Sequence, residues 1–154
     1  MIYNPPMKNR CLTLVEYQCL AEIHHQIRRY LHTGELAARA LGLEPRQHQV
    51  LLAIKGLPAG VRPRVCEVAE QLQIQHHSAV ELVNRLVSAG YVRRQRENGD
   101  RREVLLALTP KAQRTLGQMA DYHSTELDEG APAVVAALRK TLRPAPRAQS
   151  AAAS

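Results

Sequence analysis

The stretch GYVRRQRENGDRREVLLALTP, residues 90–110, decides the fold. Its two halves, 91–96 and 104–108, have strand character, and between them lies Asn98-Gly99, the dipeptide that most favours the tight turn of a β-hairpin. Thr109 and Pro110 then have the residue types of a helix N-cap and a first helical position. The stretch predicts a two-stranded hairpin followed directly by a helix.

Two short helices are expected just before the hairpin, at 63–72 and 76–89, joined by a tight turn near 73–75. Each has apolar residues at three- and four-residue spacing, which predicts one buried face: Val65, Val68, Ala69 and Leu72 in the first, and Ala79, Leu82, Val83 and Leu86 in the second. Gly90 is expected as a left-handed cap at the end of the second helix. Two such helices form a helix-turn-helix, and the hairpin makes the unit a winged helix.

Longer helices are expected on both sides of this unit. Thr13 and Glu16 form a capping-box pattern at the start of an apolar stripe that ends near Gly34, and a further turn or two is expected over 35–40. Pro45 opens the next helix, the helix from Pro110 continues through 127, and Pro132 opens the last. The fold class is therefore mainly α with a small β-hairpin: a winged helix-turn-helix with additional N- and C-terminal helices.

Positive charge gathers where this fold would meet DNA. The formal net charge is +7, and residues 75–102 hold six arginines against three acids. A helix fits the major groove of DNA, and an arginine on a hairpin suits the negative potential of a narrow minor groove. Double-stranded DNA is thus the expected partner. The alternative is a solvated hairpin whose charges only guard an exposed edge.

The run 100–112, DRREVLLALTPKA, resembles the wing signature of the MarR family of bacterial transcriptional regulators, in which Asp-x-Arg precedes a strand and then Leu-Thr. Residues 82–86 and 90–94 resemble the end of the family's recognition helix and its first wing strand. The resemblance spans roughly 12–142 and is strongest in the wing. Ala112 stands where the family usually has glycine.

The resemblance implies a role for several residues. Arg102 would enter the minor groove, Asp100 would brace it, and Arg101 would meet phosphate. Arg85 would tie the recognition helix to the wing or to a phosphate. Arg94 and Arg96 are expected to bind DNA because of the basic charge of the hairpin. The implied organisation is a winged helix-turn-helix at 45–110 with dimerisation helices at 12–42 and 111–142. The implied function is a homodimeric regulator, acting as a repressor at a pseudo-palindromic operator.

Base readout is expected at the start of the recognition helix, from Gln75, His76, His77 and Ser78. The two histidines fit equally a role facing phosphate or solvent. Glu81 stands where the family often has Thr, Ser or Arg. It could accept a hydrogen bond from cytosine N4, but the favoured interpretation is a capping box in which Glu81 reaches back to Ser78.

An effector and a redox response are expected only through the family. MarR-type proteins usually release DNA when a small molecule binds, and an anionic or aromatic effector is expected near His25, Arg28, Tyr30 and His48; these residues could equally face solvent or a dimer partner. The alternative is a thiol-based sensor of the same fold that uses Cys11 or Cys19. Cys19 lies on the apolar stripe, which favours a packing role, whereas Cys11 lies near basic residues.

Other classes of function find little support. No nucleophile, phosphate loop or paired carboxylates suggest an enzyme, no cofactor is implied, and the scattered histidines and three cysteines fit no metal motif. A dimer that binds DNA or protein without reading sequence is the alternative from another class. No secretory signal or membrane span is expected, so a cytoplasmic protein is predicted. Residues 1–11 are expected as an arm and 143–154 as a disordered tail.

Overall fold

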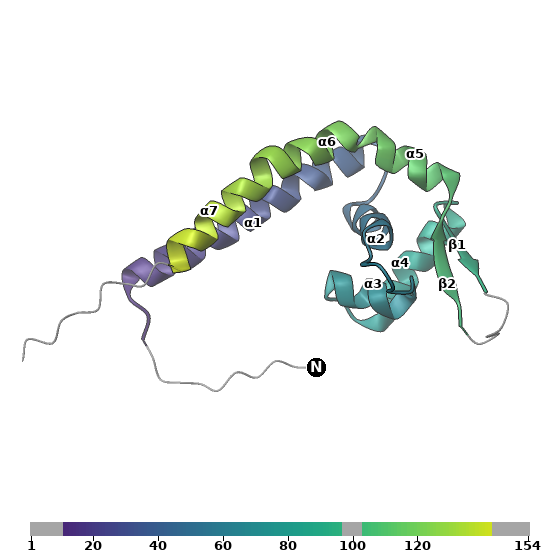
Figure 1. The fold of residues 1–154 in the computed structure, drawn as a ribbon, viewed down its shortest axis with the longest axis horizontal. Coiled ribbons are helices and arrows are strands. Elements are labelled where there is room, and N and C mark those ends of the chain that lie inside the picture. The colour runs from purple at the N-terminus through teal and green to yellow at the C-terminus, as the bar shows by residue number, and fades with distance from the viewer. Residues whose placement is uncertain (1–10, 97–102, 143–154) are drawn as a thin grey trace, which may run out of the picture. The chain divides into compact units, whose positions relative to one another are not determined.

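The computed structural model describes residues 11–96 and 103–142 (Figure 1). The predicted arm, apart from Cys11, and the predicted tail lie outside these residues, as does the hairpin tip at 97–102. The chain divides into two compact units: unit 1 comprises Met1–Leu31 with Glu126–Ser154, and unit 2 comprises His32–Thr125. Helix α1 (Leu14–Ala40) contributes to both.

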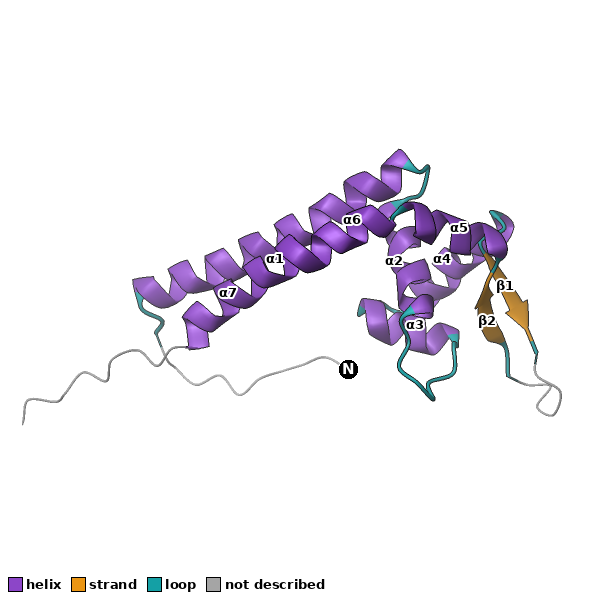
Figure 2. Cartoon of the chain, turned by 45° about the horizontal axis from the view of Figure 1, so that its top comes forward, coloured by secondary structure: helices purple, strands orange, loops and turns teal. Residues whose placement is uncertain are grey.

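Unit 1 contains α1 as far as Leu31, a π-helical turn η1 (Glu126–Gly130) and α7 (Ala131–Leu142). The predicted capping box begins α1: the Thr13 backbone N–H donates to the Glu16 carboxylate over 2.8 Å, and the Glu16 N–H donates to the Thr13 hydroxyl over 3.2 Å. Figure 2 shows α7 running beside α1. Gly130 permits a close approach here, since a Cβ at that position would lie 2.8 Å from Cδ2 of Tyr30.

The first helix does not end near Gly34, and the further turns expected over 35–40 are confirmed as its continuation. Gly34 is buried inside α1, and the helix continues to Ala40. A glycine inside a helix costs about 1 kcal/mol relative to alanine, which the strong helix formers and the fully buried Ala38 beyond it outweigh. The helix ends at Ala40, and the φ of 76° at Gly42 allows the Leu43 N–H to donate to Ala38 O over 3.0 Å.

Unit 2 contains the remaining helices and the hairpin. In chain order they are α2 (Pro45–Lys55), α3 (Val65–Leu72), α4 (His76–Ser88), β1 (Val92–Gln95), β2 (Leu105–Leu108), α5 (Pro110–Gln118) and α6 (Ala120–Thr125). Their shared core is aliphatic, as expected for a chain without Phe or Trp. Its largest fully buried side chains are Leu51, Leu86, Leu106, Met119, Val50, Val68, Val83 and Val92.

The turn between α3 and α4 is made by Gln73, which adopts a left-handed φ of 50°. This conformation lets the Ile74 N–H donate to Ala69 O over 3.0 Å, and the Gln73 side chain donates to Glu70 O over 2.8 Å. These bonds satisfy carbonyls at the end of α3. The predicted helix-turn-helix is thus present, with α4 in the position of the second helix.

The predicted hairpin is also present. Strands β1 and β2 pair antiparallel, with Val92 opposite Leu108 and Gln95 opposite Leu105. Thr109 caps α5 by accepting from the Ala112 N–H, while its hydroxyl donates to Gly90 O over 2.7 Å. Gly90 has the expected left-handed φ, 78°. Thr109 therefore joins the end of the hairpin to the end of α4.

Candidate nucleic-acid interface

Helix α4 has one buried and one exposed face. Ala79, Leu82, Val83 and Leu86 are buried, as predicted from their spacing. The proposed reading residues lie at its exposed start: Gln75, His76 and His77 are exposed and Ser78 is half-buried. Gln75, the N-cap, makes no side-chain capping bond. The first N–H groups of α4 are therefore not capped by that side chain, and the positive end of the helix dipole favours an anion here.

The predicted capping box between Ser78 and Glu81 is wrong. The helix begins at His76 with Gln75 as its N-cap, so Ser78 already lies within the helix. A capping residue must have non-helical backbone angles, and the Gln73 turn places the start of the helix too early for Ser78. Glu81 is exposed on α4, and its contact with cytosine stays a prediction.

Of the predicted DNA-binding arginines that the structure describes, Arg85 and Arg94 have protein partners. Arg94 on β1 donates to the side-chain oxygen of Asn84 on α4 over 2.6 Å. Arg85 on α4 lies 3.5 Å from the carboxylate of Glu44, and both side chains are more than half exposed, so this ion pair is weak. A guanidinium carries five N–H donors, so each arginine retains donors for a second partner. Arg96 is exposed.

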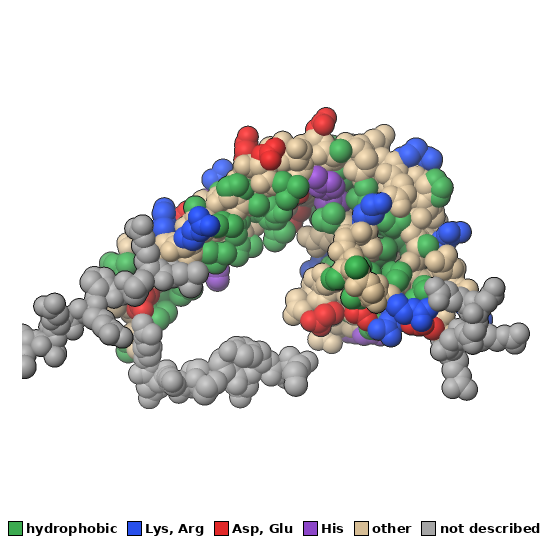
Figure 3. All heavy atoms as spheres, viewed as in Figure 1, with side chains coloured by type: hydrophobic (Ala, Val, Ile, Leu, Met, Phe, Trp, Pro, Cys, Tyr) green, Lys and Arg blue, Asp and Glu red, His purple; other side chains and the backbone are tan. Residues whose placement is uncertain are grey.

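A cluster at the base of the hairpin was not predicted. Glu103 forms ion pairs with Arg62 at 2.5 Å and with Arg64 at 3.8 Å, and Arg64 also pairs with Glu67 at 2.6 Å. Figure 3 shows acidic and basic side chains intermixed in this part of unit 2. The only local signal is the two arginines that flank Pro63. Their partner lies some forty residues further along the chain, beyond the reach of a local pattern.

Lys111 adds a contact between α5 and the end of α4. Its ammonium group donates to Ala89 O over 2.8 Å and lies 4.2 Å from the centre of the Tyr91 ring. A cation at a helix C-terminus complements the helix dipole. Together with the Thr109 bond, this contact fixes the junction of α4, the hairpin and α5.

The predicted wing-tip residues Asp100, Arg101 and Arg102 lie outside the described residues, and their roles stay predictions. The effector candidates are divided between the units. In unit 1, His25 and Arg28 are exposed, and Tyr30 is half-buried with its pKa raised by burial and by Glu126. In unit 2, His48 is buried against His123.

The cysteines are free thiols: Cys11 and Cys66 are exposed, and Cys19 is half-buried. Within 11–96 and 103–142, no cluster of three or more His, Cys, Asp or Glu side chains has the arrangement of a metal site. No helix in these ranges is long and apolar enough to cross a membrane.

A helix-turn-helix followed by an antiparallel hairpin defines the chain as a winged-helix protein. The sequence model of the MarR family matches residues 41–103, which span the helix-turn-helix and the first hairpin strand. Over this region the chain is similar to the MarR family. No curated protein sequence matches the chain.

Solved structures share the fold over most of the chain. AbsC, a MarR family transcriptional regulator from Streptomyces coelicolor, is 23% identical with a TM-score of 0.69, over 88% of this chain and 95% of that one. Sco3205 from the same organism, solved in complex with DNA, is 22% identical with a TM-score of 0.60. The match covers 90% of this chain and 81% of Sco3205. CouR from Rhodococcus jostii RHA1, solved with p-coumaroyl-CoA, is 22% identical with a TM-score of 0.57. The match covers 87% of this chain and 85% of CouR. This likeness extends to the outer helices and shows a shared fold.

Proposed function

We propose that the protein is a sequence-specific DNA-binding transcriptional regulator, and not an enzyme, acting in the cytoplasm as a repressor. The observation that carries the proposal is the exposed start of α4 beside a basic hairpin. Gln75, His76 and His77 present polar groups at the helix end that would enter the major groove. Arg102, with Asp100 as its brace, is proposed for the minor groove from the sequence resemblance.

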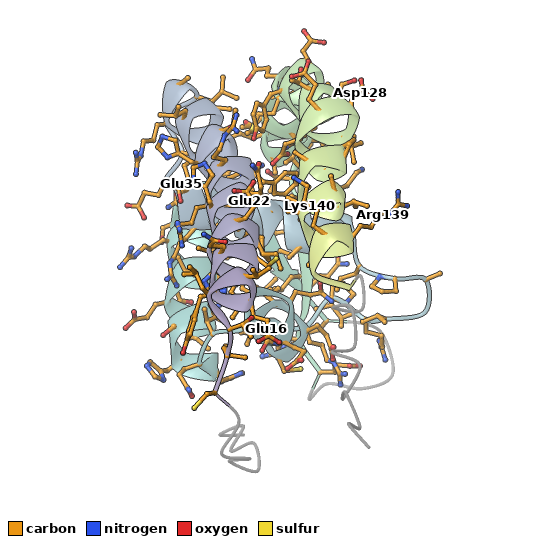
Figure 4. The ribbon with its side chains drawn as sticks, turned by 90° about the vertical axis from the view of Figure 1, so that its left-hand side faces the viewer. Glu16, Glu22, Glu35, Asp128, Arg139 and Lys140 are labelled. Carbon is orange, nitrogen blue, oxygen red and sulfur yellow. The ribbon has the colours of Figure 1, made fainter. Side chains whose placement is uncertain are left out.

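The protein is proposed to act as a homodimer through the helices of unit 1. Apolar side chains stay exposed there, with Leu14 and Leu127 at 72% and 68%. Figure 3 shows hydrophobic side chains along these helices, and Figure 4 shows Asp128 and Arg139 on the side facing away from α1. A contiguous apolar surface rimmed by charge is typical of an interface. A two-fold dimer would match a pseudo-palindromic operator.

A small anionic or aromatic effector is proposed to release the DNA. The support comes from relatives of the same fold: CouR was solved with p-coumaroyl-CoA, and 6-hydroxynicotinic acid regulates DNA binding by BpsR of Bordetella bronchiseptica. An effector acts only through different affinities for the two states of the protein. The redox alternative through Cys11 or Cys19 stays open, and peroxide treatment followed by a DNA-binding titration tests it.

Selection of DNA from a random-sequence duplex pool tests the proposal. A sequence-specific regulator should enrich a two-fold related sequence, bound with an affinity that falls steeply as salt rises, because phosphate contacts release counterions. Binding of all duplexes with equal affinity would support the dimer that does not read sequence. Absence of binding to any duplex at low salt would overturn both functions.

A further inference from the structure

Glu103 joins the return strand of the hairpin to the segment that leads into α3. Its two carboxylate oxygens pair with different arginines: Oε2 with Nη1 of Arg62 at 2.5 Å, and Oε1 with Nη1 of Arg64 at 3.8 Å. The Glu103 side chain is only 19% exposed, whereas the two arginines are 44% and 46% exposed. A partly buried carboxylate bridging two cations is a stronger link than an isolated surface pair.

The backbone beside this cluster is joined to β2 by a hydrogen bond at Pro63. The Leu106 N–H donates to Pro63 O over 2.7 Å, so the segment 62–64 lies along β2. Pro63 has no N–H to return. The Arg64 N–H is used locally, since it donates to Arg62 O over 2.8 Å. The Leu106 bond therefore holds this edge through the backbone, and the Glu103 ion pairs supply a second attachment nearer the hairpin tip.

The other strand is attached to a different helix, because Arg94 on β1 donates to Asn84 on α4. The hairpin is thus held to α4 through one strand and to the entry of α3 through the other. Glu103 directly follows the tip segment in sequence. Among the described attachments of the return strand, that of Glu103 is therefore the nearest in sequence to the tip segment.

We propose that Glu103 is a positioning residue for DNA recognition: through Arg62 and Arg64 it holds the hairpin in the orientation that reads sequence, without itself touching DNA. The inference rests on the proposed function as a sequence-specific DNA-binding protein. The negative charge of Glu103 by itself repels DNA. The proposal nevertheless predicts that Glu103 favours specific binding. The proposal is testable because removing this charge should strengthen DNA binding if only charge matters, but should weaken specific binding if Glu103 positions the hairpin.

The test compares Glu103→Gln with Glu70→Gln and Arg62→Gln. Glu70→Gln removes the same charge from α3, where the Glu70 carboxylate accepts a hydrogen bond from Gln73. Arg62→Gln breaks the same ion pair but changes the net charge in the opposite direction. The probes are a duplex that the wild-type protein selects from a random pool and a scrambled duplex of equal composition, with thermal melts confirming that each variant folds.

The measured quantity is the ratio of the affinities for the two duplexes. We expect this ratio to fall about tenfold in both Glu103→Gln and Arg62→Gln, the loss expected when a displaced hairpin no longer makes one of its DNA contacts. The double variant should lose no more than Glu103→Gln alone, because that variant already removes the ion pair with Arg62. Glu70→Gln should keep the wild-type ratio. Amide exchange at Leu106 should become faster in Glu103→Gln and Arg62→Gln only.

An equal gain of affinity for both duplexes in Glu103→Gln, with Leu106 exchange unchanged, would overturn the proposal. The only effect of Glu103 would then be to reduce the positive charge of the surface. If Glu103→Gln speeds Leu106 exchange but keeps the wild-type ratio, the ion pairs hold the hairpin without affecting recognition, and the proposal also fails. A wild-type protein that selects no sequence defeats the proposed function itself. That outcome is distinguishable, because the Leu106 exchange is measured without DNA.

Discussion

His48 on α2 and His123 on α6 meet head-on, with their Nε2 atoms 3.1 Å apart. The ring planes are within 15° of parallel, but the centroids are 5.3 Å apart, so the rings face one another at their nitrogen edges rather than overlapping. The Tyr122 and His123 rings pack in a T-shaped arrangement, with their planes at 61°. One imidazole must donate and the other accept, so only one of the two facing nitrogens can carry a proton.

This pair predicts that stability falls in acid. Burial, and then the neighbouring His123, lower the pKa of His48 from its ordinary value of 6.5. The folded state therefore binds a proton at His48 less readily than the unfolded state does. The stability linked to this difference is fully present above the ordinary pKa and is lost as pH falls toward the lower folded pKa. Urea denaturation across this pH range should show a declining free energy of unfolding.

The variant His48→Gln tests the assignment of that pH dependence. Its unfolding free energy should change less with pH than that of the wild type, because the titrating group is gone. His77→Gln, at an exposed position on α4, is the matched control and should keep the wild-type slope. A slope in His48→Gln as steep as in the wild type would assign the acid sensitivity to other groups.

Arg102→Ala should weaken specific DNA binding by about 1–3 kcal/mol while the dimer and its melting temperature stay unchanged, because a guanidinium in the minor groove would be lost. Arg139→Ala removes the same charge from α7, where the side chain is exposed, and should have a much smaller effect. Fluorescence anisotropy with the selected duplex measures both. Equal affinity of Arg102→Ala and wild type would remove Arg102 from its assigned role.

Leu138→Asp on α7 should shift the protein from dimer to monomer. Leu138 is exposed in the single chain, and burying a leucine at an interface contributes about 1.5–3 kcal/mol. The dissociation constant measured by analytical ultracentrifugation should rise at least about tenfold. Val61→Asp, at an exposed apolar position in unit 2, should leave it unchanged. A Leu138→Asp protein as dimeric as the wild type would place the interface elsewhere.

Gly130→Ala should destabilise the protein by about 1–3 kcal/mol, because the added Cβ would overlap the Tyr30 ring and force a shift in tight packing. Gly117→Ala is the natural comparison. Gly117 lies in α5, where a Cβ meets nothing within 4 Å, so alanine should stabilise by about 0.5–1 kcal/mol. Chemical denaturation of both variants checks the prediction, which fails if their effects have the same sign.

Much of the fold was predictable because its signals are local. The hairpin, the helix-turn-helix and the caps at Thr13 and Thr109 depend on residues within about four positions of one another, and hydrogen-bonding propensities act over that range. Local signals failed where packing competed with them. Gly34 does not end α1, and Ser78 does not begin α4, because the neighbouring turns and buried faces decide where those helices start and end.

The sequence by itself determined the kind of elements, their order and the basic character of the surface at α4 and the hairpin, because spacing and residue type carry that information. Only the tertiary structure decided which polar and charged side chains already have partners within the protein. It pairs Arg62 and Arg64 with Glu103, Arg94 with Asn84, and His48 with His123. These partners lie on different elements, and their meeting depends on how the helices and hairpin pack around the aliphatic core.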